Sequence, residues 1–353
     1  MNGDSLTSRP HCGPPEFDLT AEAFVRQDEN DDAVFYATER FVNHLDSLAL
    51  DTVERVIGKL VVEDDPVILD LMAGADSHIP SRLKSAGVVG LGLNEKELSQ
   101  NKALTEFVIH DLNKCPTLPF PDNTFDAVIN TVSVDYLTHP VEVFKEVGRI
   151  LKPGGLFLII FSNRMFMPKV VKVWREALEE RRVDIVRWWL ARSEQFEMPD
   201  VFVSKGKPRP VDDKYAGLDL PSDPVYVVYT DKKSATETRR ARPEINLEYG
   251  RRLGPEELQR LQKEIKHTLS CPHCGQKMRK WEVPDNPFGC YWDHEFMYIC
   301  FNDACPYFVR GWDVMQQNGT GGASYRLMWH PVRDYCVPVP VPSVHALKES
   351  IID

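Results

Sequence analysis

The chain has 353 residues, 42% hydrophobic and 27% charged, which allows two domains and is typical of a globular protein rather than a disordered one. The formal net charge of −11 at pH 7 argues against a general nucleic-acid binder, which needs a basic face. No apolar run reaches the roughly 20 residues of a membrane span, and the first 15 residues lack the apolar centre of a signal peptide. We therefore expect a cytoplasmic protein whose eight cysteines are metal ligands or free thiols.

The N-terminal part of the chain changes character near residue 33. Residues 1–32 are rich in Pro, Asp, Glu and Asn and predict a flexible arm. Between Phe35 and Val62, apolar residues recur at roughly helical spacing. This pattern predicts two helices with a break near residues 50–51, where Asp51 is a candidate N-cap.

A series of short apolar runs follows and predicts strands buried on both faces of a parallel sheet. These runs are 67–70, 88–93, 107–110, 125–129 and 156–161. A helical pattern over 141–151 separates the last two, and such alternation predicts a doubly wound, Rossmann-like α/β fold with a mostly parallel sheet. Helices within 168–192 and a closing pair of strands at 201–204 and 225–230 complete the expected domain, which spans 33–231.

The next segment, 232–266, is a basic connector. It holds ten Lys and Arg residues against six Glu, a net charge of +4. Its end, 255–267, has a helical pattern, and a small domain is expected to occupy 267–353.

Polar residues and a glycine follow the predicted strands at the edge where open α/β sheets bind ligands. Asp70 and Gly74 follow the first strand, Asn94 the second, Asp111 the third and Asn130 the fourth. A glycine turn lets the backbone approach a ligand closely, and carboxylates accept hydrogen bonds from ribose and adenine. These five residues are the candidate cofactor site.

The segments LPFPDNTFDAVI (118–129), VEVFKEVGRIL (141–151) and KPGGLF (152–157) resemble the class I S-adenosylmethionine-dependent methyltransferases, in particular the type 11 group. The resemblance spans about residues 67–230 and implies a methyltransferase fold that binds S-adenosylmethionine. By this resemblance, Asp70 and Gly74 lie around the methionine part of the cofactor. Asp111 is then the acid that meets the adenine amino group.

Two positions depart from the family pattern. The glycine places of the family's first loop, Asp-x-Gly-x-Gly-x-Gly, hold Met72, Gly74 and Asp76. The acid that accepts both ribose hydroxyls at the end of the second strand is replaced by Gly92, with Asn94 or Glu95 as candidate substitutes. These departures support an alternative hypothesis, a catalytically silent methyltransferase-like scaffold or binding protein.

Methyl transfer requires proximity and a dry pocket, and a base only where the nucleophile must lose a proton. Asp135 and Tyr136, in the loop after the fourth strand, are the candidate catalytic residues. Further candidates on the substrate side are Tyr36, Arg40, His44, Ser133, Ser162, Asn163 and Arg164. His44 is expected to be packed or solvated, and the acceptor is a small molecule, a protein or an RNA.

The C-terminal cysteines occur in two close pairs, Cys271/Cys274 and Cys300/Cys305. Four thiolates arranged in this way form a closed tetrahedral shell for structural zinc, and Cys290 is a reserve ligand. The pattern resembles zinc ribbons of the Ogr/Delta type.

The charge of this small domain bears on its partners. Seven basic residues against nine acidic ones over 267–353 give −2, so its many aromatic residues favour a small core or a protein-docking face over a nucleic-acid surface. A nucleic-acid-associated protein, gripping RNA or DNA through the connector and ribbon, is the second alternative.

Overall fold

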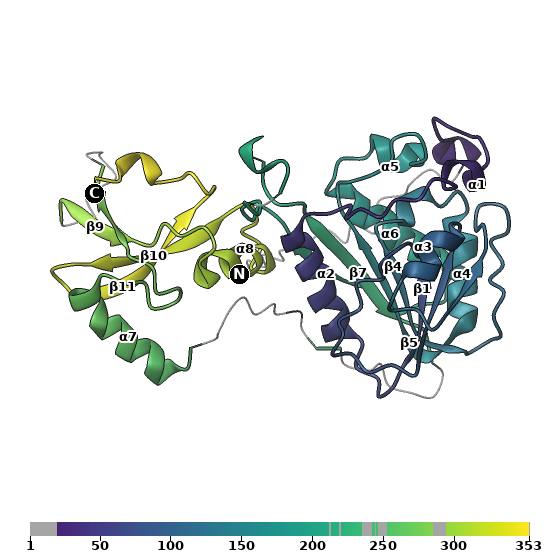
Figure 1. Cartoon of the computed structure of the whole chain (residues 1–353), viewed down its shortest axis with the longest axis horizontal. Coiled ribbons are helices and arrows are strands. Elements are labelled where there is room, and N and C mark those ends of the chain that lie inside the picture. The colour runs from purple at the N-terminus through teal and green to yellow at the C-terminus, as the bar shows by residue number, and fades with distance from the viewer. Residues whose placement is uncertain are drawn as a thin grey trace, which may run out of the picture.

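A computed structural model describes residues 20–211, 213–218, 220–234, 242–243, 245, 253–284 and 294–352. Figure 1 shows two units, an α/β unit built on a seven-stranded sheet and a smaller C-terminal unit built on a four-stranded antiparallel sheet. In the described part of the chain, no helix combines the length and apolar character of a membrane span.

The large sheet has the strand order β3-β2-β1-β4-β5-β7-β6. Its strands are β1 (Val67–Leu71), β2 (Gly87–Gly92), β3 (Glu106–Ile109), β4 (Phe125–Thr131), β5 (Leu151–Phe161), β6 (Asp200–Ser204) and β7 (Val225–Asp231). Strands β1 to β5 pair in parallel, while β7 lies antiparallel between β5 and β6. The predicted strands and the mostly parallel α/β fold are confirmed.

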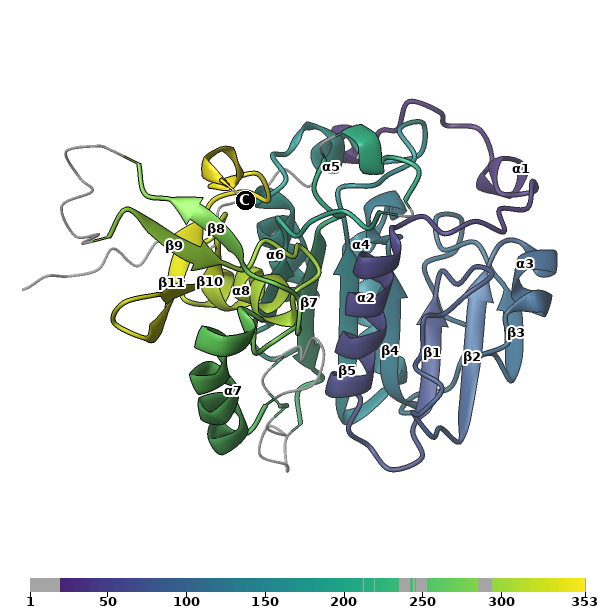
Figure 2. The same cartoon turned by 60° about the vertical axis from the view of Figure 1, so that its left-hand side comes forward.

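Helices cover both faces of this sheet, because the central strands are apolar on both sides. Figure 2 shows α2 (Ser47–Leu60) on one face, with α4 (Pro140–Ile150) and α6 (Arg181–Ser193) behind the sheet. The remaining helical elements of this unit are η1 (Ala21–Phe24), α1 (Asp32–Phe35), α3 (Glu95–Gln100), η2 (Val134–Tyr136), α5 (Lys172–Glu176) and η3 (Ala216–Leu218). The helices expected within 141–151 and 168–192 are thus confirmed.

The prediction of two helices broken at residues 50–51 is wrong. One helix, α2, crosses this point, and its N-cap is Asp46, whose carboxylate accepts a hydrogen bond from the Ala49 N–H at 2.9 Å. Asp51 lies inside the helix and pairs with Arg55 at 2.7 Å. The residues between α1 and Asp46 form turns and bends rather than a helix, and the Asp46 N–H donates to Asp223 at 2.9 Å.

Of the flexible arm predicted over residues 1–32, residues 1–19 lie outside the described residues, and residues 20–32 make specific contacts with the α/β unit. Their anchor is Lys169, whose fully buried ammonium lies 3.0 Å from Asp32 and 3.3 Å from Asp28. Asp32 also accepts hydrogen bonds from Arg26 at 2.7 Å. Composition alone did not indicate this segment's order, because its acidic residues are neutralised by distant cations.

The C-terminal unit contains α7 (Pro255–Thr268), β8 (Arg279–Glu282), β9 (Phe296–Ile299), α8 (Pro306–Gln317), β10 (Ser324–His330), β11 (Tyr335–Val341) and η5 (Lys348–Ser350). The strand order is β11-β10-β9-β8, and the helix expected over 255–267 is confirmed as α7. Helix α8 packs against the outer strand β6 of the large sheet. At this joint, Lys207 pairs with Asp313 at 2.9 Å, and both side chains are buried.

Candidate functional site

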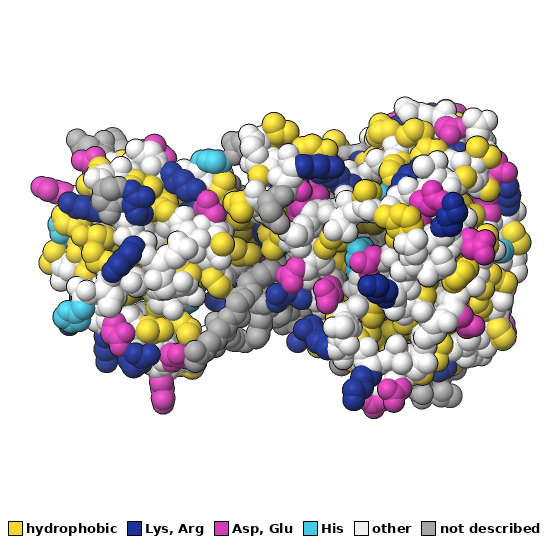
Figure 3. Space-filling model, in the orientation of Figure 1, with side chains coloured by type: hydrophobic (Ala, Val, Ile, Leu, Met, Phe, Trp, Pro, Cys, Tyr) yellow, Lys and Arg dark blue, Asp and Glu magenta, His cyan; other side chains and the backbone are white. Residues whose placement is uncertain are grey.

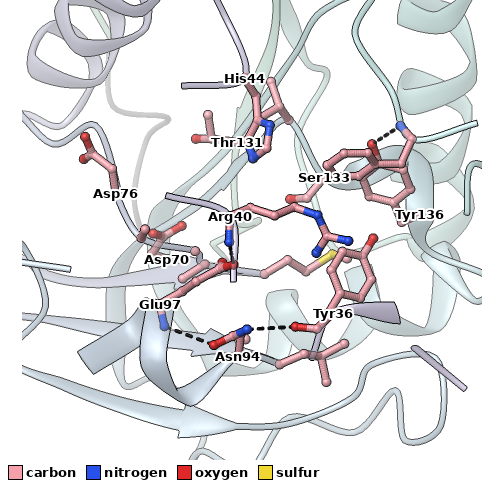
Figure 4. Close-up of a pocket in the computed structure, with 18 of the residues that line it drawn as sticks. Tyr36, Arg40, His44, Asp70, Asp76, Asn94, Glu97, Thr131, Ser133 and Tyr136 are labelled. Carbon is pink, nitrogen blue, oxygen red and sulfur yellow. Dashed lines mark hydrogen bonds between the residues drawn. The ribbon is translucent and has the colours of Figure 1, made fainter. Parts of the chain in front are cut away.

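A cavity of about 550 Å³ opens at the carboxyl ends of β1, β2 and β4. That volume lies within the range of small-ligand sites, and the position is the one that open α/β sheets use for ligands. Residues 36–45, which we call the roof segment, supply much of its wall. Figure 4 shows Arg40 of this segment beside Glu97, with its side chain extending towards Tyr36 and Tyr136, while Asp70 lies on the other side of the view.

The first turn of the cavity follows β1. Met72 adopts a φ of 64°, a left-handed conformation that favours glycine, and it stands where the resembled family has one. The Ala73 N–H then donates to the Leu91 carbonyl at 2.8 Å, which ties the turn to β2. A Cβ atom added to Gly74 would meet only the Glu97 Oε2 atom, at 3.4 Å. The glycine therefore leaves open space for a ligand.

Asp70, at the start of this turn, lines the cavity although its side chain is only 4% exposed. Burial raises the pKa of its carboxyl to about 7, and a hydrogen bond with Ser77 opposes that rise. Near neutral pH this group therefore exists in both protonation states, so it can donate or accept a hydrogen bond.

At the end of β2, backbone packing explains the missing acid. A Cβ atom on Gly92 would lie 2.4 Å from the Ala73 carbonyl oxygen, so this position accommodates no side chain without backbone movement. Asn94 lines the cavity, but both the oxygen and the NH₂ group of its side chain already have hydrogen-bond partners. Its oxygen caps α3 by accepting from Lys96 and Glu97, at 3.0 and 3.1 Å, and its amide donates to the Tyr36 carbonyl at 2.8 Å.

Of the other two predicted cofactor residues, Asp111 lines the cavity and Asn130 does not. The Oδ1 atom of Asp111 accepts hydrogen bonds from the backbone of Asn113 and Lys114, at 3.0 and 3.3 Å. Asn130 is buried, and its amide donates to Leu71 and Ser133, both at 3.0 Å. Asp70, Gly74, Asn94 and Asp111 thus share one cavity, whereas Asn130 supports the wall from behind.

The predicted catalytic residues also occupy different places. Tyr136 lines the cavity, and its hydroxyl accepts a hydrogen bond from the Phe166 N–H at 2.8 Å. Its ring stacks on Phe166 with a centroid distance of 5.9 Å. Asp135 lies outside the lining, fully buried, and burial raises the pKa of its carboxyl to about 7.

The roof segment adds a cation and an imidazole. The Arg40 guanidinium stacks over Phe35 and Phe166 at 4.8 and 5.2 Å and donates to the backbone carbonyls of Thr38 and Phe35. Burial, together with nearby Arg40, lowers the pKa of His44, which favours the neutral imidazole. Its ring meets Phe166 edge-on at 5.5 Å.

Phe166 and Glu97 also line the cavity, and neither was predicted from the sequence. Phe166 follows β5 in an irregular segment, so no periodicity indicated which way its ring points. Glu97 lies in the first turn of α3, three residues after the cap Asn94. That spacing from a helix cap is the one local signal that was available.

A second candidate site lies in the C-terminal unit. The Sγ atoms of Cys271, Cys274, Cys300 and Cys305 all lie within 4.8 Å of one another. The Cys271–Cys305 and Cys274–Cys300 pairs are 3.9 and 3.7 Å apart. Thiolates about 2.3 Å from a tetrahedral zinc are about 3.8 Å from each other, which agrees with these two distances. Cys290, the reserve ligand, is outside the described residues.

Part of the chain around the first site is similar to a known protein family. Residues 72–159 match the model of a family described as "Methyltransferase domain". This segment runs from the first cavity turn into β5, and it supports a methyltransferase domain in this part of the chain.

The individual relatives are similar to short parts of the chain. It is 26% identical to a malonyl-[acyl-carrier protein] O-methyltransferase of Marinomonas sp. (strain MWYL1), over 34% of this chain and 47% of the relative. It is 32% identical to cycloartenol-C-24-methyltransferase 1 of Oryza sativa subsp. japonica, over 29% of this chain and 32% of the relative. The chain thus spans less than half the length of these curated relatives.

Two solved structures are also similar. A putative S-adenosylmethionine-dependent methyltransferase from Listeria monocytogenes has a TM-score of 0.37 at 13% identity, covering 52% of this chain and 99% of its own. The complex of the Haloferax volcanii Trm112 methyltransferase activator with a putative methyltransferase gives 0.38 at 14% identity, covering 54% of this chain and 92% of the matched one.

Proposed function

We propose that the protein transfers a methyl group from S-adenosylmethionine to an acceptor bound in the cavity above β1, β2 and β4. The observation that carries this proposal is a ligand-sized cavity around the Asp70–Gly74 turn, within the segment that matches a methyltransferase domain. The cofactor, when bound, supplies an activated methyl group.

The chain's own residues bind, orient and exclude water in this proposal. Gly74 allows close backbone approach, and Asp70 and Asp111 offer hydrogen-bonding groups to the cofactor. Asn94 and Asn130 fix the walls around it. Aromatic rings on the acceptor side keep the reacting atoms dry, which favours a displacement that needs mostly proximity.

For the catalytic residues, we propose that Tyr136 contacts the acceptor directly, while Asp135 positions it from behind. Where the acceptor must lose a proton, neutral His44 is placed to receive it. The relatives' names include both an O-methyltransferase and a C-methyltransferase, so an acceptor search begins with both classes.

The test is calorimetric titration with S-adenosylmethionine and with S-adenosylhomocysteine. We expect micromolar binding by the wild type and at least a tenfold loss in Gly74→Leu, whose side chain enters the cavity without a backbone clash. Gly254→Leu, at an open position preceding α7, is the control. A wild type that binds neither ligand would instead support the silent scaffold.

We also propose that the four clustered cysteines hold one structural zinc ion. Metal analysis of protein purified without chelator should give about one zinc per chain. Cys271→Ser should lose the metal and destabilise the C-terminal unit, whereas Cys336→Ser, outside the cluster, should retain it. Metal-free wild-type protein contradicts this assignment.

For the C-terminal unit, we propose a zinc ribbon that aids recognition of the substrate or of a protein partner, in a cytoplasmic setting. Figure 3 shows acidic and basic side chains interspersed on its visible face, a distribution unlike the basic stripe of nucleic-acid binders. Oligonucleotide binding that weakens steeply with salt would favour the nucleic-acid alternative.

A further inference from the structure

Glu97 places a carboxylate at the cavity with one oxygen uncommitted. Its Oε1 accepts a hydrogen bond from the Arg40 N–H at 2.7 Å. Its Oε2 faces the Gly74 turn, and among the described residues it has no hydrogen-bond donor. Burial raises the pKa of this carboxyl, whereas the hydrogen bond and the charge of Arg40 lower it. Because burial has the larger effect, Arg40 offsets the cost of burying this carboxylate only in part.

Other groups at this rim have less capacity to accept a ligand's hydrogen bonds. Gly92 has no room for a side chain, and both ends of the Asn94 amide are engaged. Asp111 caps its own turn, and its Oδ2 lies 3.8 Å from the Lys114 ammonium. Asp76 accepts from His78 N–H at 2.8 Å and is largely exposed. Asp70, at the start of the turn, is almost completely buried, which leaves Glu97 as the partly buried acceptor that faces the turn from α3.

We propose that Glu97 Oε2 accepts hydrogen bonds from the ribose hydroxyls of the bound cofactor. This inference rests on the proposed function, because it requires an adenosine ligand in the cavity. In nucleotide-binding α/β folds, an acid about 20 residues after the glycine turn bonds a ribose hydroxyl. Glu97 follows Gly74 by 23 residues, and the closed position at Gly92 moves the acid from the strand end onto α3.

The assignment also links ligand and roof. One oxygen of the Glu97 carboxylate already accepts from the Arg40 N–H of the roof segment. If the other oxygen accepts from the ribose, this side chain connects the bound ligand with both α3 and the roof segment. Two other donors on the cofactor suit a carboxylate, the α-ammonium of its amino acid and the adenine amino group. The experiment must therefore separate ribose from both.

The experiment is calorimetry of the wild type, Glu97→Ala and Glu97→Gln with three ligands. These are S-adenosylhomocysteine, 5′-deoxy-5′-methylthioadenosine, which lacks the amino acid, and the 2′,3′-dideoxy analogue of S-adenosylhomocysteine. Hydrogen bonds to a charged group predict that Glu97→Ala binds the first two about 10- to 100-fold more weakly than wild type. The dideoxy analogue should show a clearly smaller loss, because for this ligand the substitution removes only the hydrogen bond with the Arg40 N–H.

Two controls keep the result specific. Glu97→Gln keeps an acceptor for Arg40 N–H but removes the charge, and it should show most of the same loss. Glu95, the other acid considered for the ribose, is exposed and does not line the cavity, so Glu95→Ala should bind like wild type.

Three outcomes overturn the inference. An effect confined to S-adenosylhomocysteine would assign Glu97 to the ammonium. Equal losses for all three ligands would assign it to the adenine amino group or make it only a support of the roof, and either reading excludes the ribose. If Glu97→Ala binds all three ligands as tightly as the wild type does, Glu97 does not contribute to the binding site. In each case binding by the wild type leaves the proposed function intact, whereas a wild type that binds no adenosine ligand overturns both.

Discussion

Two carboxyl groups, Asp70 and Asp135, are almost completely shielded from water, and burial raises the pKa of each to about 7. An unfolded chain ionises such groups near pH 4. Between these values the folded state holds protons that the unfolded state releases, so stability falls as pH rises. Both groups therefore oppose folding at neutral pH.

We expect Asp135→Asn to flatten this pH dependence, because the amide does not ionise. Relative to wild type, the variant should gain up to about 1.4 kcal/mol per pH unit between pH 5 and 7. The measurement is the free energy of unfolding in urea at pH 5, 6, 7 and 8, with exposed Asp122→Asn as control. A difference between variant and wild type that is constant with pH would contradict the raised pKa.

At Gly92, the neighbouring backbone limits which residue types can occupy the position. Ala at this position brings Cβ to 2.4 Å from the Ala73 carbonyl, whereas Ala at Gly90 meets a Leu104 methyl at the same distance. A leucine can rotate and a packed carbonyl cannot. We expect Gly92→Ala to lower the free energy of unfolding by about 1–3 kcal/mol and Gly90→Ala by clearly less. Equal losses would show that the turn adapts.

At the scale of elements, α2 shows why some boundaries were predictable and others were not. Strand positions followed from apolar runs, and the four cysteines from their spacing, since both are local signals. The start of α2 depends on Asp46, which bonds Ser222 and Asp223 more than 170 residues away. Asp51 has the right residue type for a cap, but only tertiary contacts identify Asp46 instead.

The same reasoning applies to the site. Strand-end residues such as Asp70 and Gly74 were predictable because the fold class fixes which sheet edge binds ligands. Glu97 and Phe166 reach the cavity from a helix and an irregular segment, and their direction depends on packing. The sequence therefore indicated the strand-end floor of the cavity and three residues of its roof, Tyr36, Arg40 and His44, but not these two wall residues.

We expect Asp46→Ala to lower the free energy of unfolding by about 2–4 kcal/mol, because it removes a helix cap and leaves buried partners unsatisfied. Asp51→Ala, which removes only a partly exposed pair with Arg55, should cost about 0.5 kcal/mol or less. Urea unfolding of both variants measures the contrast. Similar costs would mean that Asp46 is an ordinary cap.

At the scale of the whole molecule, the joint between β6 and α8 combines close packing with a buried charge pair. Gly206 has a φ of 82°, and a Cβ atom there would lie 2.8 Å from the Trp312 ring. Next to it, Lys207 and Asp313 pair at 2.9 Å. Burial lowers the pKa of Lys207, and Asp313 opposes that change. Removing either member of this pair would therefore leave the other charge buried without a partner, which destabilises the joint.

We expect Lys207→Met to lower the free energy of unfolding by about 3–5 kcal/mol, because Asp313 is left buried without its cation. The double variant Lys207→Met/Asp313→Leu should recover at least half of this loss. A double-mutant cycle in urea, with Lys205→Met as the partly exposed control, measures the coupling. Strictly additive losses would show that the two charges act independently.

The position of β7 between β5 and β6 has a consequence for synthesis on the ribosome. Strand β6, which ends at Ser204, has no place beside β5, because β7 (Val225–Asp231) must enter between them. Until residue 231 has left the exit tunnel, β5 keeps an open, apolar edge of the kind that pairs with other chains. Fragments that end before β7 should therefore aggregate, and the nascent chain should depend on chaperones during this interval.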